Sequence, residues 1–345
     1  MPRQPTRTAR IAREKIITMA CELKDAFPPL RNLSEALDLH PSTIFRLLRD
    51  LSTEGIVWQS PSGKFYPASA RSQGVRGLPV YFIGREMWHW SRLYQEILTG
   101  VSEVCSANGS PLILLSAPSL VRQTDPSLPP VFASPATQKK ELTALLPSIP
   151  NKCGGILLDH LWSEAAISLL GMTGTPKVQL LHGTGHKTSL AAPDMTWSAR
   201  CVREFLEQEQ ISQINLVIPF QGDTAIDAAL KTLRTMLAGL PFREIAFAKL
   251  NGKLRSLTAQ PGPGKLCLIC AEDNTAQVLL EQRNALGEAG DNILLLSTQG
   301  TGLLSAPACR LRVDYRRLGR AAASQLLHGT PLPRLRATLV APTPA

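Results

Sequence analysis

The apolar run VYFIG at residues 80–84 precedes the run YQEILTG at residues 94–100. The first run has the length and composition of a buried strand, and we assign a strand to residues 78–84. The second run belongs to a helix that we predict over residues 91–108. A strand followed by a helix is the repeating unit of parallel sheets covered by helices. This unit therefore predicts an α/β domain that begins at Leu78.

The same alternation continues along the chain. Further strands are predicted at residues 111–116, 154–159, 176–182, 188–192, 214–219, 244–249, 265–271 and 292–297. The helices predicted among them cover residues 138–147, 163–171, 196–209, 223–238 and 274–287. Continuous apolar strands in this order indicate parallel sheets with helices on both faces. About 250 residues exceed one doubly wound sheet of ordinary size, so we predict two sheets with a cleft between them.

Residues 1–66 have a different pattern. Helical spacing predicts helices over residues 8–24 and 32–37, and a third helix that begins at Pro41 and ends at Gly55. Two short strands at residues 56–58 and 64–66 complete the segment. Three helices and a hairpin within about 60 residues are the layout of a winged helix-turn-helix domain. The alternative interpretation is a three-helix core with a solvated basic face.

The N-terminal part of the chain is also its most basic part. Residues 1–77 carry 12 Lys or Arg and 7 Asp or Glu, whereas the whole chain has a formal net charge of +10. This balance favours nucleic acid as the anionic partner, with a membrane surface second. We predict that the exposed face of the third helix enters the major groove while basic side chains around it neutralise phosphates. The predicted DNA contacts are Ser42, Thr43, Arg46, Arg49, Lys64, Arg7 and Arg10.

Two family resemblances follow from these runs. LSEALDLHPSTIFRLL at residues 33–48, with EGIV at residues 54–57, resembles the DNA-binding domains of the GntR and IclR regulator families. Residues 78–342 resemble the effector domain of the LacI/GalR family, which shares its fold with periplasmic sugar-binding proteins. Besides residues 80–84 and 94–100, the landmarks of this second resemblance are GGILLD at residues 154–159, CLICAED at residues 267–273 and VDYRRLGRAA at residues 313–322.

The two resemblances imply a domain organisation. A winged helix-turn-helix domain is expected at residues 1–66, a linker at residues 67–77 and a periplasmic-binding-protein-like effector domain at residues 78–342. The effector domain is expected to have two doubly wound parallel-sheet subdomains. We assign residues 78–182 and 299–328 to the first, and residues 183–298 and 329–342 to the second.

The chain also departs from the LacI/GalR pattern in the cleft. Asp227 stands near the position of the family's cleft arginine, and Glu272-Asp273 replaces its Asn-Asp pair. The family's hinge-helix sequence is absent as well. The resemblance implies a sugar-like effector, and these departures indicate a ligand other than the family's usual sugar.

Ligands of open α/β sheets bind beyond the carboxyl ends of the strands, where loops converge. We therefore predict that the ligand is bound by polar side chains that follow the predicted strands. These residues are Arg85, Asp159, His160, His182, Gln221, Glu272, Asp273 and Gln299. Asp159 and Asp273 are the strongest candidates, although each could instead cap the helix that follows it.

Motifs for metal binding and catalysis are absent or incomplete. Cys267 and Cys270 have no second pair at zinc spacing, and within a strand their side chains would point to opposite faces. His182 and His186 are separated by glycines that disfavour a helix, and no nearby acid completes a metal site. No nucleophile elbow, zinc-protease helix or dinucleotide turn is present. We expect no catalytic site, no cofactor and no resident metal.

These observations together predict a cytoplasmic transcription regulator, with repression favoured over activation as its mode of control. Its partners would be a double-stranded DNA operator and a small-molecule effector, and it would act as a homodimer because a symmetric pair of readers binds two half-sites. No run is long and apolar enough to cross a bilayer, and no signal-peptide core follows the basic N-terminus. The alternatives are a small-molecule binding protein without specific DNA binding, and an enzyme on an α/β scaffold.

Overall fold

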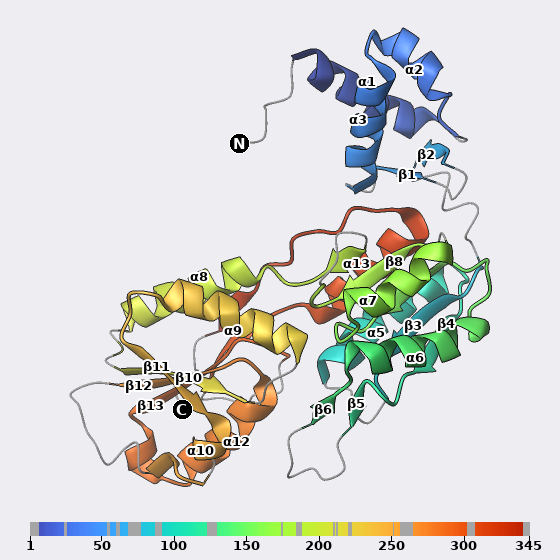
Figure 1. Cartoon of the computed structure of the whole chain (residues 1–345). Coiled ribbons are helices and arrows are strands. Elements are labelled where there is room, and N and C mark those ends of the chain that lie inside the picture. The colour runs from blue at the N-terminus through green and yellow to red at the C-terminus, as the bar shows by residue number, and fades with distance from the viewer. Residues whose placement is uncertain are drawn as a thin grey trace.

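The chain forms an N-terminal domain and two α/β lobes, with the N-terminal domain above the first lobe in the view of Figure 1. The computed structural model describes residues 7–23, 26–53, 56–59, 63–67, 77–86, 92–122, 130–173, 175–183, 188–209, 211, 213–219, 223–250, 252–255, 265–301 and 308–340. None of the helices in these ranges is long and apolar enough to span a membrane.

The N-terminal domain has three helices and a hairpin in the predicted order. Its elements are α1 (Arg7–Glu22), α2 (Leu30–Leu37), α3 (Pro41–Thr53), β1 (Val57–Gln59) and β2 (Phe65–Pro67), and the two strands are antiparallel. Ile16 of α1, Leu33 of α2 and Ile44 of α3 are fully buried against one another. The turn between α2 and α3 passes through Asp38, which has a left-handed backbone conformation with φ of 49°. The apolar residues whose spacing predicted these helices therefore form the packed faces of the helices.

The first lobe, here called the N lobe, is built on a five-stranded parallel sheet. Its strands, in spatial order, are β4 (Leu112–Ser116), β3 (Val80–Gly84), β7 (Gly155–Leu158), β8 (Lys177–Leu180) and β9 (Ser189–Ala191). Helices α5 (Arg92–Ala107) and α13 (Tyr315–His328) cover one face, and α6 (Pro135–Leu145) and α7 (Glu164–Ile167) cover the other. Short 3₁₀ turns at Leu146–Ser148 and Ser168–Thr173 follow α6 and α7.

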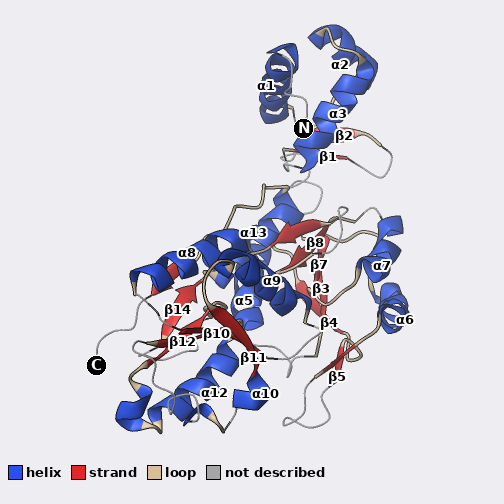
Figure 2. Ribbon diagram, turned by 60° about the vertical axis from the view of Figure 1, so that its left-hand side comes forward, coloured by secondary structure: helices blue, strands red, loops and turns tan. Residues whose placement is uncertain are grey.

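The second lobe, here called the C lobe, has a six-stranded sheet. The strand order is β11 (Phe242–Ala246), β10 (Gln213–Ile218), β12 (Leu266–Cys270), β13 (Ile293–Ser297), β14 (Cys309–Arg312) and β15 (Thr338–Val340), and only β15 runs antiparallel to its neighbour. Helices α8 (Met195–Gln208) and α9 (Thr224–Leu237) lie on one face, and α10 (Phe247–Leu250) and α12 (Asp273–Asn284) lie on the other (Figure 2). A 3₁₀ turn at Gly287–Gly290 follows α12.

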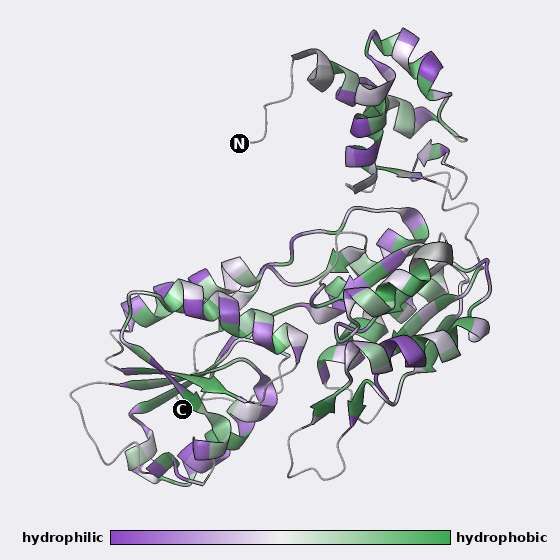
Figure 3. Ribbon diagram, viewed as in Figure 1, coloured by the Kyte–Doolittle hydropathy of each residue, from purple (hydrophilic) through white to green (hydrophobic). Residues whose placement is uncertain are grey.

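The apolar strands lie between layers of helices whose polar residues face outward (Figure 3). Phe82 and Leu157 of the N lobe belong to the same continuous core as Leu216 and Ile269 of the C lobe. Each sheet also has a smaller core on its other face. Burial of both faces explains why the strand sequences are continuously apolar rather than alternating.

The chain crosses between the lobes three times, after β9, after β14 and after α13 (Figure 1). The subdomain boundaries therefore differ from those predicted. Strand β9 pairs with β8 in the N lobe although residues 183–298 were assigned to the second subdomain. Strand β14 pairs with β13 in the C lobe although residues 299–328 were assigned to the first. The lobe to which a strand belongs is decided by the strand it pairs with. An apolar run in the sequence does not show that partner.

Some elements also differ from the predictions. The predicted strand at residues 244–249 is wrong in its second half, because β11 ends at Ala246 and α10 begins at Phe247. Strands β14 and β15 were not predicted, nor was the small antiparallel pair of β5 (Val121–Arg122) and β6 (Val131–Phe132). These strands are two to four residues long, which is too short for a periodic signal.

Helices α5 and α13 approach each other so closely that only glycine fits at their contact. A Cβ atom added to Gly319 would lie 1.9 Å from the Ile97 carbonyl oxygen, and one added to Gly100 would lie 2.0 Å from the Arg316 carbonyl oxygen. Because both neighbours are backbone atoms, the helices themselves would have to separate.

We expect Gly319→Ala to lower the free energy of unfolding by roughly 1–3 kcal/mol, the usual cost of forcing extra volume into a packed interior. Chemical denaturation followed by circular dichroism measures this change. Ser102→Ala on the exposed face of α5 is the control and should change stability by less than about 0.5 kcal/mol. A Gly319→Ala variant as stable as the control would contradict the close contact.

Candidate functional site

A cavity of about 590 Å³ lies between the two lobes. Five of the eight predicted ligand residues line it, namely Arg85, His160, His182, Glu272 and Gln299. Asp159 and Asp273 are buried and are not among the lining residues, and Gln221 lies outside the described residues. The cavity also has polar lining residues that the sequence analysis missed, which are Tyr94, Asp223, Thr232, Asn274, Thr298 and Tyr315.

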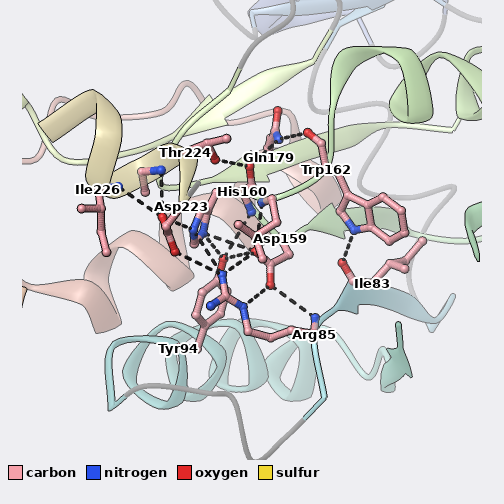
Figure 4. Close-up of polar contacts among 12 residues, drawn as sticks. Ile83, Arg85, Tyr94, Asp159, His160, Trp162, Gln179, Asp223, Thr224 and Ile226 are labelled. Carbon is pink, nitrogen blue, oxygen red and sulfur yellow. Dashed lines mark hydrogen bonds and ion pairs between the residues drawn. The ribbon is translucent and has the colours of Figure 1, made fainter. Parts of the chain in front are cut away.

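The N-lobe wall is organised by an ion pair between Arg85, directly after β3, and Asp159, directly after β7 (Figure 4). Arg85 donates through Nε to Asp159 Oδ2 at 2.9 Å and through a terminal nitrogen to Asp159 Oδ1 at 3.1 Å. The Asp159 side chain is fully buried and also accepts the backbone N–H of Leu161. Burial alone would raise the pKa of Asp159, but the charge of Arg85 lowers it to about 2. Asp159 therefore remains ionised and fixes the direction of the guanidinium group.

His160 connects this pair to the C lobe. Its Nδ1 lies 2.9 Å from the Tyr94 hydroxyl, and its Nε2 lies 2.8 Å from Oδ1 of Asp223 (Figure 4). A carboxylate accepts hydrogen bonds, so Nε2 carries a proton and donates it to Asp223. Burial opposes ionisation of Asp223, yet the neighbouring His160 and Arg85 hold the pKa of Asp223 well below its ordinary value. Residues that follow β3 and β7 in the N lobe and the N-terminus of α9 in the C lobe therefore belong to one buried hydrogen-bond network.

Asp223 is held in place by its own helix. It caps α9, accepting the backbone N–H groups of Ala225 and Ile226 at 3.0 and 3.2 Å. The next residue, Thr224, donates its hydroxyl to the His160 carbonyl oxygen at 2.8 Å, which is a second bond between the lobes. Asp at a helix N-cap is a common sequence signal, but its reach into the opposite lobe is a tertiary feature.

The loop that carries His160 is held in place by hydrogen bonds to neighbouring strands of the N lobe. The Trp162 indole donates to the Ile83 carbonyl oxygen at 2.9 Å, and Gln179 of β8 donates to the Trp162 carbonyl oxygen at 3.0 Å (Figure 4). Tyr94 stacks on the His160 ring, with 5.9 Å between the ring centroids. The imidazole is therefore oriented before any ligand enters.

The C-lobe wall begins where β12 ends. Asp273 accepts hydrogen bonds from the hydroxyl groups of Ser297 and Thr301 and from the Thr301 backbone N–H, while its own N–H donates to Gln299 Oε1 at 2.9 Å. The Asp273 side chain thus ties α12 to the segment after β13. Neither Asp159 nor Asp273, the two strongest predicted ligand contacts, reaches the cavity, because both carboxylates are consumed by hydrogen bonds beneath its wall. We assign both residues to supporting the wall.

Glu272 and His182 are two further titratable residues of the lining. Burial raises the pKa of Glu272 to about 7, against the lowering effect of a hydrogen bond from the Thr275 hydroxyl. Burial also lowers the pKa of His182, so this imidazole is neutral at pH 7. Arg85 is consequently the only permanent cation among the described residues of the lining.

The predicted DNA contacts lie mostly on the surface of the N-terminal domain. Ser42, Arg46 and Arg49 are exposed on α3, Thr43 is half-buried there, and Lys64 is exposed before β2. The side chains of Arg7 and Arg10 lie outside the described residues. Phe45, which sequence reasoning left out, is 38% exposed on the same helix. The α3 surface therefore combines basic, hydroxyl and aromatic groups.

The cysteine pair behaves as the strand period predicts. Cys267 packs in the core beneath α8 and α9, and Cys270 packs in the core beneath α10 and α12. The two thiols therefore face opposite sides of β12. In the described part of the chain no three His, Cys, Asp or Glu side chains gather in a group that could hold a metal ion.

Comparison with known proteins identifies the fold. No protein-family profile and no curated protein sequence matches the chain. Among solved structures, the trehalose repressor from Escherichia coli is 15% identical, with a TM-score of 0.57 over 76% of this chain and 100% of that chain. A sugar-binding LacI-family transcriptional regulator from Enterococcus faecalis is 14% identical, with a TM-score of 0.56 over 77% of this chain and 96% of that chain.

A LacI-family regulator from Weissella paramesenteroides, solved with bound glucose, is 14% identical with a TM-score of 0.59 over 76% of this chain and 96% of that chain. At these identities the likeness shows the fold. The predicted α/β fold with parallel sheets, of the periplasmic-binding-protein-like type found in LacI-family regulators, is confirmed.

Removing Asp159 should destabilise the protein, because Arg85 would remain buried without its bidentate partner. We expect Asp159→Ala to lower the free energy of unfolding by about 3–5 kcal/mol, the usual cost of breaking a buried ion pair from one side. Denaturant titration of the full chain measures it. Asp227→Ala, at an exposed carboxylate on α9, is the matched control and should be nearly neutral. A loss below about 1 kcal/mol would show that Arg85 does not depend on Asp159.

Glu272 should make stability depend on pH. Its pKa is raised in the folded state from 4.5 to about 7, so its contribution is fully favourable below pH 4.5 and is lost as the pH rises through 7. Glu272→Gln removes this loss. Relative to wild type, the variant should gain on the order of 3 kcal/mol between pH 4.5 and pH 8, at about 1.4 kcal/mol per unit of pKa shift.

Thermal and urea unfolding at both pH values measure this difference, and Glu281→Gln on the exposed face of α12, the helix that follows Glu272, is the control. Equal pH dependence of Glu272→Gln and wild type would refute the raised pKa.

Proposed function

We propose that this chain is a ligand-responsive transcription regulator that binds DNA sequence-specifically through residues 1–66 and a small-molecule effector through the cleft. The observation that carries the proposal is the presence, in one chain, of an exposed basic helix on a small domain and a cavity between two lobes bridged by a buried polar network. The trehalose repressor among the similar structures supports repression as the direction of control.

The DNA-binding part of the proposal rests on α3 as the reading helix of a winged helix-turn-helix. Ser42 and Arg46 lie on its exposed face, and Arg49 follows one turn later. Arg46 can donate two hydrogen bonds to a guanine, and the exposed ring of Phe45 can contact a thymine methyl group. Lys64 at the hairpin would neutralise a backbone phosphate. The GntR/IclR-like resemblance of residues 33–48 is consistent with this assignment.

Control by a ligand requires two arrangements of the protein that bind the ligand differently. The network of His160 and Asp223 joins the lobes at the cavity, so a ligand that enters the cavity changes the groups that hold the lobes together. The three crossovers between the lobes permit rotation of one lobe on the other. The proposed coupling is a change in lobe closure that alters the spacing of two DNA readers.

The proposal includes a homodimer, because two readers bind a symmetric site more tightly than one. The edge strand β4 of the N lobe supports a pairing face there. Its sequence is LILLS, and Leu114 is 44% exposed. An apolar strand at the edge of a sheet presents backbone groups and side chains with which another chain can pair. Sedimentation of the wild type and of Leu114→Lys distinguishes a dimer formed through β4 from a monomer.

Arg46→Ala should weaken binding to the specific site by roughly 1–3 kcal/mol if Arg46 reads a base. Genomic fragments are first selected with the purified chain, and the affinity for the enriched site is then measured at two salt concentrations. Arg200→Ala, at an exposed residue of α8 on the C lobe, is the control and should leave the affinity unchanged.

A steep salt dependence with a two-fold symmetric enriched sequence is the expected result. Equal affinity of Arg46→Ala and wild type would remove Arg46 from the reader. Failure to enrich any sequence would leave a small-molecule binding protein without specific DNA binding, and turnover of a cleft ligand would instead indicate an enzyme.

A further inference from the structure

Glu272 is the residue of the cleft whose charge the protein does not balance. It lies two residues after β12, is 8% exposed and lines the cavity. One carboxylate oxygen accepts the Thr275 hydroxyl at 2.5 Å. Within the described residues no Lys, Arg or His forms an ion pair with it, whereas Asp159 and Asp223 each pair with Arg85, and Asp223 also pairs with His160.

The cleft as a whole has an excess of acid. Four carboxyl groups line it or lie directly beneath its wall, and they are Asp159, Asp223, Glu272 and Asp273. Arg85 is the one permanent cation of the described lining, and its bidentate bond to Asp159 already occupies it. Asp223 and Asp273 each accept several hydrogen bonds from the protein. Among the described residues Glu272 accepts one side-chain hydrogen bond, from Thr275, so it is the carboxyl group of the cleft that the protein stabilises least.

A ligand that enters this cleft meets that carboxylate in a poorly solvated place. An anionic group would be repelled by both Glu272 and Asp223. A neutral hydroxyl group could donate one hydrogen bond but would leave the buried charge uncompensated. A protonated amine does both, since it donates hydrogen bonds and neutralises the charge. The ammonium group is therefore the complement of this wall.

The rest of the cavity is suited to a compact, partly apolar body. Leu93, Leu190, Met195 and Ile226 contribute apolar lining, and the volume of about 590 Å³ suits a molecule with one or two rings. Gln299 adds a hydrogen-bonding side chain from the C lobe. We infer that the effector is a ring-sized organic cation whose primary ammonium group pairs with the Glu272 carboxylate. This inference rests on the proposed function in taking the cleft as the effector site.

The test is calorimetric titration of the full-length chain at pH 7.5 with two sets of matched compounds. The first set is 2-phenylethylamine, 2-phenylethanol and phenylacetate, and the second is glucosamine, glucose and glucuronate. In at least one set we expect the amine to bind at least 10-fold more tightly than its neutral and anionic analogues. The set that responds distinguishes an aromatic amine from an amino sugar.

Variants assign the effect to Glu272. Glu272→Gln keeps the shape of the side chain and removes its charge, so amine affinity should fall at least 10-fold. Glu281→Gln, at an exposed residue of α12, should bind the amine as wild type does. Equal amine affinity of Glu272→Gln and wild type would overturn the inference, as would preferential binding of the alcohol, the sugar or either acid, or no binding of both amines.

The pH profile is a second readout. Asp223, Asp273 and Thr275 of the C lobe act on Glu272, and Arg85, His160 and His182 line the same cavity from the N lobe. Amine affinity of wild type should rise from pH 5.5 to pH 7.5 as Glu272 loses its proton. The rise should be lost in Glu272→Gln, whose histidines are unchanged. A rise that persists in this variant would assign the pH dependence to the histidines and contradict the pairing.

Failure of this inference and failure of the proposed function give different results. Specific DNA binding together with binding of glucose alone keeps the regulator and overturns the amine. Amine binding that depends on Glu272, without enrichment of any DNA sequence, keeps the amine site and overturns the regulator.

Discussion

The bond between His160 of the N lobe and Asp223 of the C lobe is the interaction on which the arrangement of the cleft depends. Both side chains are buried, and burial of charged groups is tolerated only where they are paired and hydrogen-bonded. Arg85 and Asp159 satisfy this requirement within the N lobe, and the cap of α9 satisfies it on the C-lobe side. These polar groups therefore determine the arrangement of the two lobes. They also determine which side chains the cavity wall offers to a ligand.

The same network explains why the site lies where it does. Arg85 and His160 come from the carboxyl ends of β3 and β7, and Glu272 comes from the carboxyl end of β12. Parallel strands bring these ends to one edge of each sheet, and the crossovers place the two edges opposite each other. The apolar cores position the sheet edges that face the cavity. The short polar segments after the strands provide the side chains that a ligand would contact. A small number of side-chain changes there can alter ligand class without altering the fold.

Sequence reasoning identified the parallel strands and the residues that end them, because continuous apolar runs and strand-end loops are local features. It could not tell Arg85, which lines the cavity, from Asp159, which supports it, since both follow a strand. Tyr94 was hidden by its place on the apolar face of α5, and Asp223 was assigned only as the first residue of a predicted helix. Membership of β9 and β14 in their lobes also depended on which strands they pair with, and apolar runs alone do not show this.

The central claim is that the buried network holds the lobes together around the cavity. The most direct test is the distribution of distances between spin labels at positions 139 on α6 and 281 on α12, introduced through non-canonical residues and measured by pulsed electron resonance. In Asp223→Ala the account predicts a longer and broader distribution than in wild type, whereas Asp227→Ala should match wild type. An unchanged distribution in a folded Asp223→Ala protein would contradict the account and show that the crossovers alone set the lobe arrangement.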